Sequence, residues 1–106
     1  MNSGHLIYSV SLDVDPEVEP DFNDWYTNVH LPVVVACPGF VSGKRYTART
    51  VGKDAAPVAR YWALYEIESE EALTSPELQS LRGEGFGRFT DHVRDVRRMV
   101  FSPLAG

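Results

Sequence analysis

The sequence contains a single cysteine, and none of its apolar runs is long enough to span a bilayer. Cys37 cannot form a disulfide within the chain, which is typical of a reducing compartment. The longest nearly uncharged run, residues 29–41, is too short for a membrane span, and the start of the chain has no basic region followed by an apolar run. We therefore expect a cytoplasmic protein without a membrane partner.

Positive charge is missing from residues 1–43, which hold six acids and no lysine or arginine. The rest of the chain is close to neutral, with nine acids against ten bases. An acidic first third disfavours a surface that follows phosphates, and no stretch interleaves bases with aromatic residues as single-strand binders do. We therefore expect no nucleic-acid partner.

Motifs for metals and cofactors are also missing. The three histidines are scattered without the spacing of metal ligands, and the lone thiol has no second sulfur to join it. The glycines within residues 83–87 follow a helical segment and lack the spacing of a dinucleotide fingerprint. A haem would need an axial ligand and a large cavity, which the sequence does not display. We expect neither a metal nor a cofactor.

What the chain does have is a regular succession of strand and helix patterns over one domain, residues 1–106. Strands are predicted from alternation and composition, and helices from apolar periodicity and start signals. The predicted strands are 5–12, 40–49, 60–67 and 92–101, and the predicted helices run from 22 to a break at 37–39, over 70–74 and over 76–82. Segment 13–21 is predicted to be a loop. The fold class is α+β, a ferredoxin-like βαββαβ arrangement with a four-stranded antiparallel sheet.

A sheet of this kind has helices on one face only, and a chain this short cannot cover the other face itself. An exposed apolar sheet face of that size is typical of an interface. We expect a homodimer that packs sheet against sheet, which gives a dimeric α/β barrel.

The first predicted helix has the strongest pattern. Its helical spacing places Val29 and Val33 near the centre of an apolar stripe, with Trp25 at one edge. Pro32 removes a backbone hydrogen bond, so the helix should kink or loosen near it. In the strand after this helix, Gly43 indicates a bulge or a close approach of backbone.

The candidate site lies along the other edge of that helix, where Asn23, Tyr26 and His30 share one side. A histidine with an ordinary pKa of about 6.5 can give or take a proton near neutrality. His30 is therefore the candidate catalytic residue, with Tyr26 and Asn23 as substrate-binding groups. The competing interpretation is that His30 caps the kink and that Tyr26 only packs.

Four further residues are candidate substrate-binding groups. Tyr8 and Tyr65 could offer phenols to a substrate oxygen, although tyrosines that alternate in strands usually pack. Arg45 could hold a carboxylate by a two-pronged contact, against the alternative of a solvated strand end. Glu66 could orient His30 if it points at the helix layer.

Several motifs resemble the EthD-like branch of the dimeric α/β-barrel superfamily. They are the pattern Phe22-x-x-Trp25-Tyr26-x-x-x-His30-Leu31-Pro32, the Pro38-Gly39-Phe40 entry into a strand ending Arg45-Tyr46, and the stretches TSPELQSLRGEGF and HVRDVRRMVF. The resemblance covers nearly the whole chain and implies a small apolar pocket between helix and sheet in each protomer. In several relatives a histidine on the first helix faces that pocket, which matches His30 with Tyr26. The superfamily includes isomerases, polyketide cyclases, cofactor-free monooxygenases, dehydratases and haem-degrading enzymes.

Three functions are therefore open. The leading hypothesis is a small cofactor-independent enzyme that acts by proton transfer, as an isomerase, cyclase or lyase, on an apolar oxygenated ring or polyketide-like molecule. His30 would be the general acid or base. The alternatives are a non-catalytic dimer that holds a small hydrophobic molecule, and a cofactor-free monooxygenase of phenolic substrates.

Overall fold

The structure, a computed structural model, describes residues 4–53 and 56–104. Within them four strands form one sheet in the order β2-β3-β1-β4, and every neighbouring pair is antiparallel. The strands are β1 (Leu6–Val14), β2 (Phe40–Thr47), β3 (Tyr61–Ile67) and β4 (Val93–Phe101). The helices are η1 (Pro16–Val18), α1 (Glu19–Trp25), η2 (Tyr26–His30), α2 (Leu31–Val35), η3 (Glu70–Thr74), α3 (Pro76–Glu84) and η4 (Gly87–His92). The predicted ferredoxin-like fold class is confirmed.

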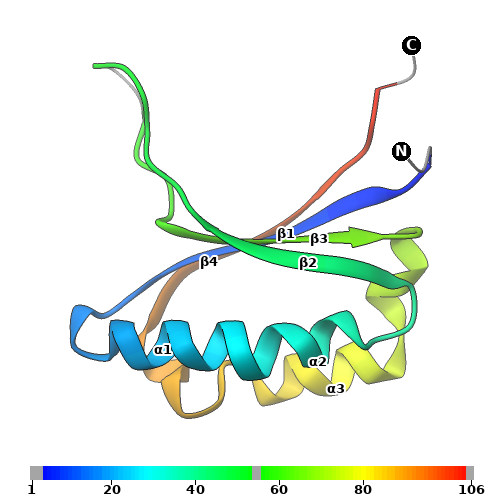
Figure 1. Ribbon diagram of the computed structural model, residues 1–106, viewed down its shortest axis with the longest axis horizontal. Coiled ribbons are helices and arrows are strands. Elements are labelled where there is room, and N and C mark those ends of the chain that lie inside the picture. The colour runs from blue at the N-terminus through cyan, green and yellow to red at the C-terminus, as the bar shows by residue number, and fades with distance from the viewer. Residues whose placement is uncertain (1–3, 54–55, 105–106) are drawn as a thin grey trace.

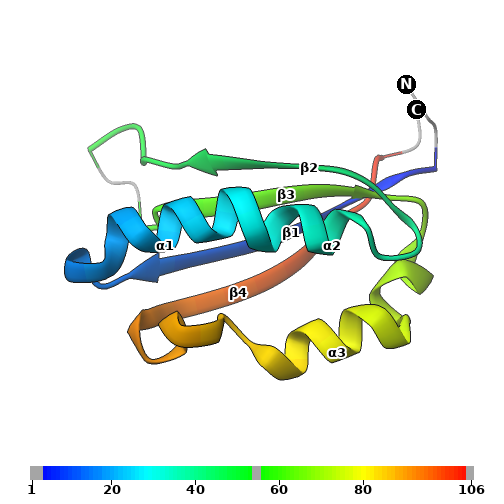
Figure 2. The same ribbon diagram turned by 60° about the horizontal axis from the view of Figure 1, so that its bottom comes forward.

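The helices all lie on one face of the sheet, as Figures 1 and 2 show. On that face β1 buries Tyr8, Val10 and Leu12, whose strand partners on β3 are also buried. The alternation that predicted the strands therefore marks the core. The strand boundaries differ little from the predicted ones: β1 continues to residue 14, and β2 ends at residue 47 instead of 49.

The prediction of a loop over residues 13–21 is wrong. The short helix η1 turns the chain after β1, and α1 already begins at Glu19. Pro20 occupies the first turn, where a helix needs no N–H from it, and Glu19 and Asp21 place negative charge at the positive end of the helix. The apolar stripe alone gives no sign of this polar first turn.

The first helix widens in its middle. Residues 26–30 form a π-helical turn, in which the N–H of Leu31 donates to the carbonyl of Tyr26. The predicted loosening near Pro32 is confirmed in this turn, which lies directly before the proline. Because a π turn holds one more residue than an α turn, it rotates the next part of the helix about the helix axis.

That rotation changes which side chains face the core. Phe22, Tyr26 and Val34 are buried, whereas Val29 and Val33 are 53% and 46% exposed. The predicted centre of the apolar stripe is therefore wrong, because the prediction assumed a regular 3.6-residue turn throughout.

Gly43 lies where backbone and aromatic ring meet closely. A Cβ at this position would lie 2.7 Å from Cδ1 of Tyr65 and 2.9 Å from Cγ2 of Val35. The shift in strand register lies just before it, between Phe40 and Ser42. The predicted close approach at Gly43 is confirmed, and it lets the Tyr65 ring lie beneath the helix.

The other face of the sheet carries no helix within the described residues. Several of its apolar side chains are exposed, among them Ile7, Met99 and Phe101, while Ser9 and Ser11 on the central strand are buried beneath their neighbours. Over 4–53 and 56–104, no helix has both the length and the apolar character that crossing a membrane requires.

We expect Gly43→Ala to destabilise the protein by about 1–3 kcal/mol, because the new methyl group overlaps the Tyr65 ring. Urea denaturation would measure the loss. Gly83→Ala is the matched control, since Gly83 lies in α3 with no atom within 4 Å of an added Cβ. Alanine there should be neutral or stabilising by up to about 1 kcal/mol. A Gly43→Ala variant as stable as the parent would contradict the close approach.

Candidate functional site

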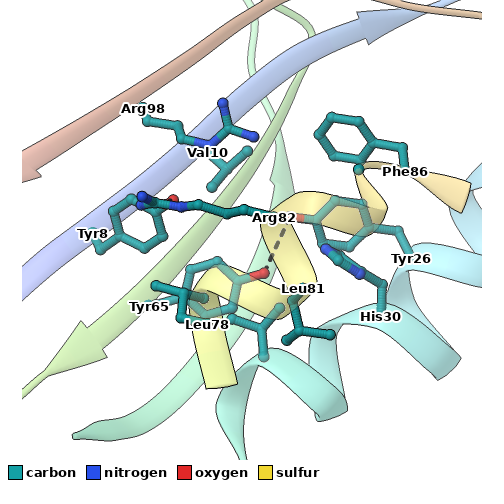
Figure 3. Close-up of a pocket in the computed structure, with 12 residues that line it drawn as sticks. Tyr8, Val10, Tyr26, His30, Tyr65, Leu78, Leu81, Arg82, Phe86 and Arg98 are labelled. Atoms are coloured by element: carbon teal, nitrogen blue, oxygen red, sulfur yellow. Dashed lines mark hydrogen bonds between the residues drawn. The ribbon is translucent and has the colours of Figure 1, made fainter. Parts of the chain in front are cut away.

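A small pocket lies between the helices and the sheet (Figure 3). Tyr8 and Tyr65 come from the two central strands, Tyr26 and His30 from the π turn, and Arg82 from α3. The other lining residues are mostly apolar and are Val10, Val34, Leu78, Leu81, Gly85, Phe86 and Arg98. The free volume is about 40 Å³, close to the space of one water molecule.

Two phenols form the polar centre of the pocket. The hydroxyl groups of Tyr26 and Tyr65 lie 3.1 Å apart, and both side chains are buried. Burial raises the pKa of both phenols, so both stay protonated at neutral pH. Because one hydroxyl donates to the other, the second phenolic proton is available to a further oxygen.

His30 forms one wall of the pocket. Its ring stacks on Trp25, with centroids 4.9 Å apart and planes at 19°, and meets the Tyr26 ring edge-on at 4.8 Å. The expectation that Trp25 lies at the opposite edge of the helix from His30 is therefore wrong. The widened turn brings the two rings together.

Burial lowers the pKa of His30 from 6.5 to about 4, and the Arg45 guanidinium contributes in the same direction. The predicted ordinary pKa near neutrality is wrong for this site, because the ring is packed among aromatic side chains. At neutral pH His30 is an uncharged imidazole with one nitrogen free of a proton, which can accept one.

Glu66 does not orient His30. It lies on the opposite face of β3 from Tyr65, and its Oε2 is 2.5 Å from Nδ1 of His5. The predicted pairing of Glu66 with His30 is wrong. Alternation along a strand separates the two faces but does not say which of them the helices cover.

Arg45 and Asn23 lie together outside the pocket. The Arg45 guanidinium carbon is 4.4 Å from the centroid of the Tyr26 ring, and Nη1 donates to Oδ1 of Asn23 at 3.1 Å. The prediction of a solvated end for Arg45 is wrong, because the side chain runs under the helix. Asn23 does not line the pocket of Tyr26 and His30; it borders a separate surface recess with Arg45 and Tyr61.

Arg82, Arg98 and Phe86 line the pocket but were not predicted as site residues. Arg82 donates from Nη2 to the Tyr8 hydroxyl at 3.2 Å, across 74 positions of sequence. The alternation along β4 could have indicated Arg98, because Arg98 lies opposite Val10 on the helix-covered face. Nothing in the sequence near Arg82 indicated its partner.

One group of potential metal ligands lies away from the pocket. Ligand atoms of Asp15, Glu17 and His92 come within 4.8 Å of one another. The Asp15 carboxylate already pairs with Arg94 and accepts from Nδ1 of His92 at 3.1 Å. Asp15 and His92 are therefore already paired within the protein.

Residues 5–101 match the family described as Domain of unknown function (DUF4286). The chain belongs to the DUF4286 family. No curated protein matches the sequence significantly.

Solved structures with the same fold are distant in sequence. An EthD family protein from Bacillus halodurans has 17% identity and a TM-score of 0.62, covering 93% of this chain and 99% of its own. A DABB family protein with a ferredoxin-like fold, from Mesorhizobium loti, has 14% identity, a TM-score of 0.64 and coverages of 97% and 100%. The haem degrader MhuD from Mycobacterium tuberculosis, with two haems bound in its active site, has 15% identity, a TM-score of 0.64 and coverages of 95% and 97%. The resemblance of this DUF4286 protein to EthD-like proteins is thereby confirmed as a likeness of fold.

We expect NMR titration of the His30 ring to give a pKa of about 4. The His30 ring resonance is assigned by its absence from the spectrum of the His30→Gln variant. Arg45→Met should raise the pKa, though only part of the way to 6.5, because burial is the larger cause. Arg88→Met, a change of equal charge outside the pocket, is the control. A His30 pKa close to 6.5 in the parent protein would contradict the packing described for this ring.

Proposed function

We propose that this DUF4286 protein is a cofactor-independent enzyme that acts by proton transfer on an oxygenated ring or polyketide-like molecule. The reaction is an isomerisation, a cyclisation or an elimination. The observation that carries the proposal is one pocket that holds both an uncharged imidazole, His30, and a hydrogen-bonded pair of phenols, Tyr26 and Tyr65.

The two kinds of group have complementary roles. The free phenolic proton of the Tyr26–Tyr65 pair donates to a carbonyl oxygen of the substrate. His30 takes a proton from the carbon next to that carbonyl, and the electron pair of the broken C–H bond moves to the oxygen as an enolate. The phenol stabilises the negative oxygen, and the nearby negative charge stabilises the imidazolium. Return of the proton to a different carbon completes an isomerisation.

We expect His30→Ala to lower kcat/KM by about 10² to 10⁴, the usual contribution of a general acid or base. The natural substrate need not be known in advance. Exchange of C–H hydrogen for deuterium in unsaturated lactones and cyclic ketones, followed by NMR, reports the proton transfer directly. Val29→Ala, on the exposed side of the same turn, is the control and should keep full activity.

The pH profile tests the assignment to His30. Because only the unprotonated ring accepts a proton, kcat/KM should fall as pH drops through about 4 and should stay level toward neutrality. His30→Gln should lack this acid limb. Unchanged exchange in a folded His30→Ala variant, or oxygen uptake with a phenol in place of exchange, would contradict the proposal.

We also propose that the protein forms a homodimer through the sheet face without helices. Ile7, Met99 and Phe101 expose apolar surface there, and Trp62 and Leu64 of β3 share that face. The hydroxyl of Ser9 is buried at the centre without a hydrogen-bond partner among the described residues. A second sheet would cover this apolar surface and remove it from water.

We expect a dimer in sedimentation equilibrium at micromolar concentration. Met99→Glu should shift it to monomer, because a carboxylate in the interface beside exposed apolar side chains would lose its hydration. The matched control is Val33→Glu, an exposed valine on the helix side, which should stay dimeric. A monomeric parent protein would refute the sheet-to-sheet dimer.

A further inference from the structure

The mouth of the pocket carries positive charge without any matching acid. Arg82 and Arg98 line it, and among the residues that the structure describes no aspartate or glutamate does. Elsewhere in the described part of the chain, Arg60 pairs with Glu19 and Arg94 with Asp15, but no ion pair there involves Arg82 or Arg98. Both side chains are exposed to solvent at the mouth.

Arg98 is held at the pocket by strand register. It lies opposite Val10 on the helix-covered face, whereas its neighbour Arg97 lies opposite Ser11 on the other face. The charge of Arg98 also reaches the phenol pair, because it acts to lower the pKa of Tyr26 against the larger effect of burial. An anion near the phenols would therefore meet this guanidinium.

Arg82 reaches the same place from the last turn of α3, where the helix dipole favours a cation. Its hydrogen bond goes to the Tyr8 hydroxyl, a neutral acceptor. A guanidinium can bind a carboxylate or phosphate through two parallel N–H···O hydrogen bonds between opposite charges, which a single hydroxyl cannot offer. In Figure 3 the Arg82 side chain extends toward Tyr8. If Arg82 gave up the Tyr8 hydroxyl for an anionic ligand, the Arg82 side chain would move and the pocket, with a free volume of about 40 Å³, would become larger.

A third guanidinium lies behind the phenols. The Arg45 guanidinium carbon lies 4.4 Å from the centroid of the Tyr26 ring, and Nη1 donates to neutral oxygens of Asn23 and Thr27. Its buried Nε has no hydrogen-bond partner among the described residues. Arg82, Arg98 and Arg45 thus lie around the tyrosines of the site, and no carboxylate lines the pocket within residues 4–53 and 56–104. Like charges repel in such an arrangement, and a bound anion would relieve the repulsion.

We propose that the substrate of this pocket is an anion, an oxygenated ring with a carboxylate or related charged oxygen group that Arg82 and Arg98 bind. That the ligand is a substrate rests on the proposed function, whereas its binding does not, because an anion can bind without being turned over. The ring would lie against Phe86 and the phenols, and the charged group would lie at the mouth.

The test compares three probes of similar size: salicylate, phenyl phosphate and the neutral amide salicylamide. Binding is followed by the NMR shifts of Trp25 and His30, which stack at the pocket wall. We expect at least one of the two anions to bind about tenfold or more tighter than salicylamide at low salt, and the difference to shrink at high salt. The tighter of the two identifies the charged group.

Arg82→Met and Arg98→Met should each remove most of the preference for the anion and leave salicylamide affinity unchanged. Arg88→Met is the control of equal charge, exposed and outside the pocket, and should keep the preference. Equal affinities for anions and amide, or a preference that survives both pocket variants, would overturn the inference. Tight anion binding without any proton exchange would refute the proposed reaction and leave the anion site standing.

Discussion

The hydrogen bond between Tyr26 and Tyr65 is the contact on which the site depends. Each of these two buried hydroxyl groups requires a hydrogen-bond partner, because leaving one unpaired in an aromatic layer would lower the stability of the protein by about 1–3 kcal/mol. The bond joins the widened turn of the first helix to the centre of the sheet. It requires Gly43, since any larger residue would meet the Tyr65 ring. The turn that supplies Tyr26 also supplies His30, so the phenol pair and the imidazole are fixed together.

Burial then sets the charge of the titratable groups at the centre of the pocket. It raises the pKa of both phenols and lowers that of His30. At neutral pH the same pocket therefore holds protonated donors and an unprotonated acceptor, without any exchange of protons between them. The guanidinium of Arg45 reinforces this division, because a nearby cation disfavours the imidazolium. Proton transfer requires a protonated donor and an unprotonated acceptor to be present before the substrate binds.

Local patterns predicted the fold well because each element obeys a local rule. The alternation of side chains predicted the strands, and start signals predicted a helix over 76–82. In the structure Ser75 caps this helix, α3, by accepting from the N–H of Leu78. The regular helical wheel failed after Tyr26, because a π turn depends on how a proline and the surrounding packing are accommodated. A rule for ideal helices contains no such information. Four of the candidate site residues line the same pocket: Tyr26 and His30 from the first helix, and Tyr8 and Tyr65 from two strands. Contacts such as that of Arg82 with Tyr8, across 74 positions, depend on which sheet face the helices cover and on how α3 crosses it. Local periodicity encodes neither, so the position of Arg82 could not be predicted.

Large aromatic side chains fill much of the layer between the helices and the sheet. Tyr8, Tyr65 and Phe86 line the pocket and leave a free volume of about 40 Å³. Each large aromatic side chain occupies space that a smaller residue would leave to a ligand. A ligand must therefore be small, or must displace a long and exposed side chain at the mouth, Arg82. Displacing Arg82 breaks one hydrogen bond to a neutral hydroxyl, and an anionic ligand can accept two parallel hydrogen bonds from the guanidinium in its place. Size and charge thus favour the same ligand, a small ring with an acidic group.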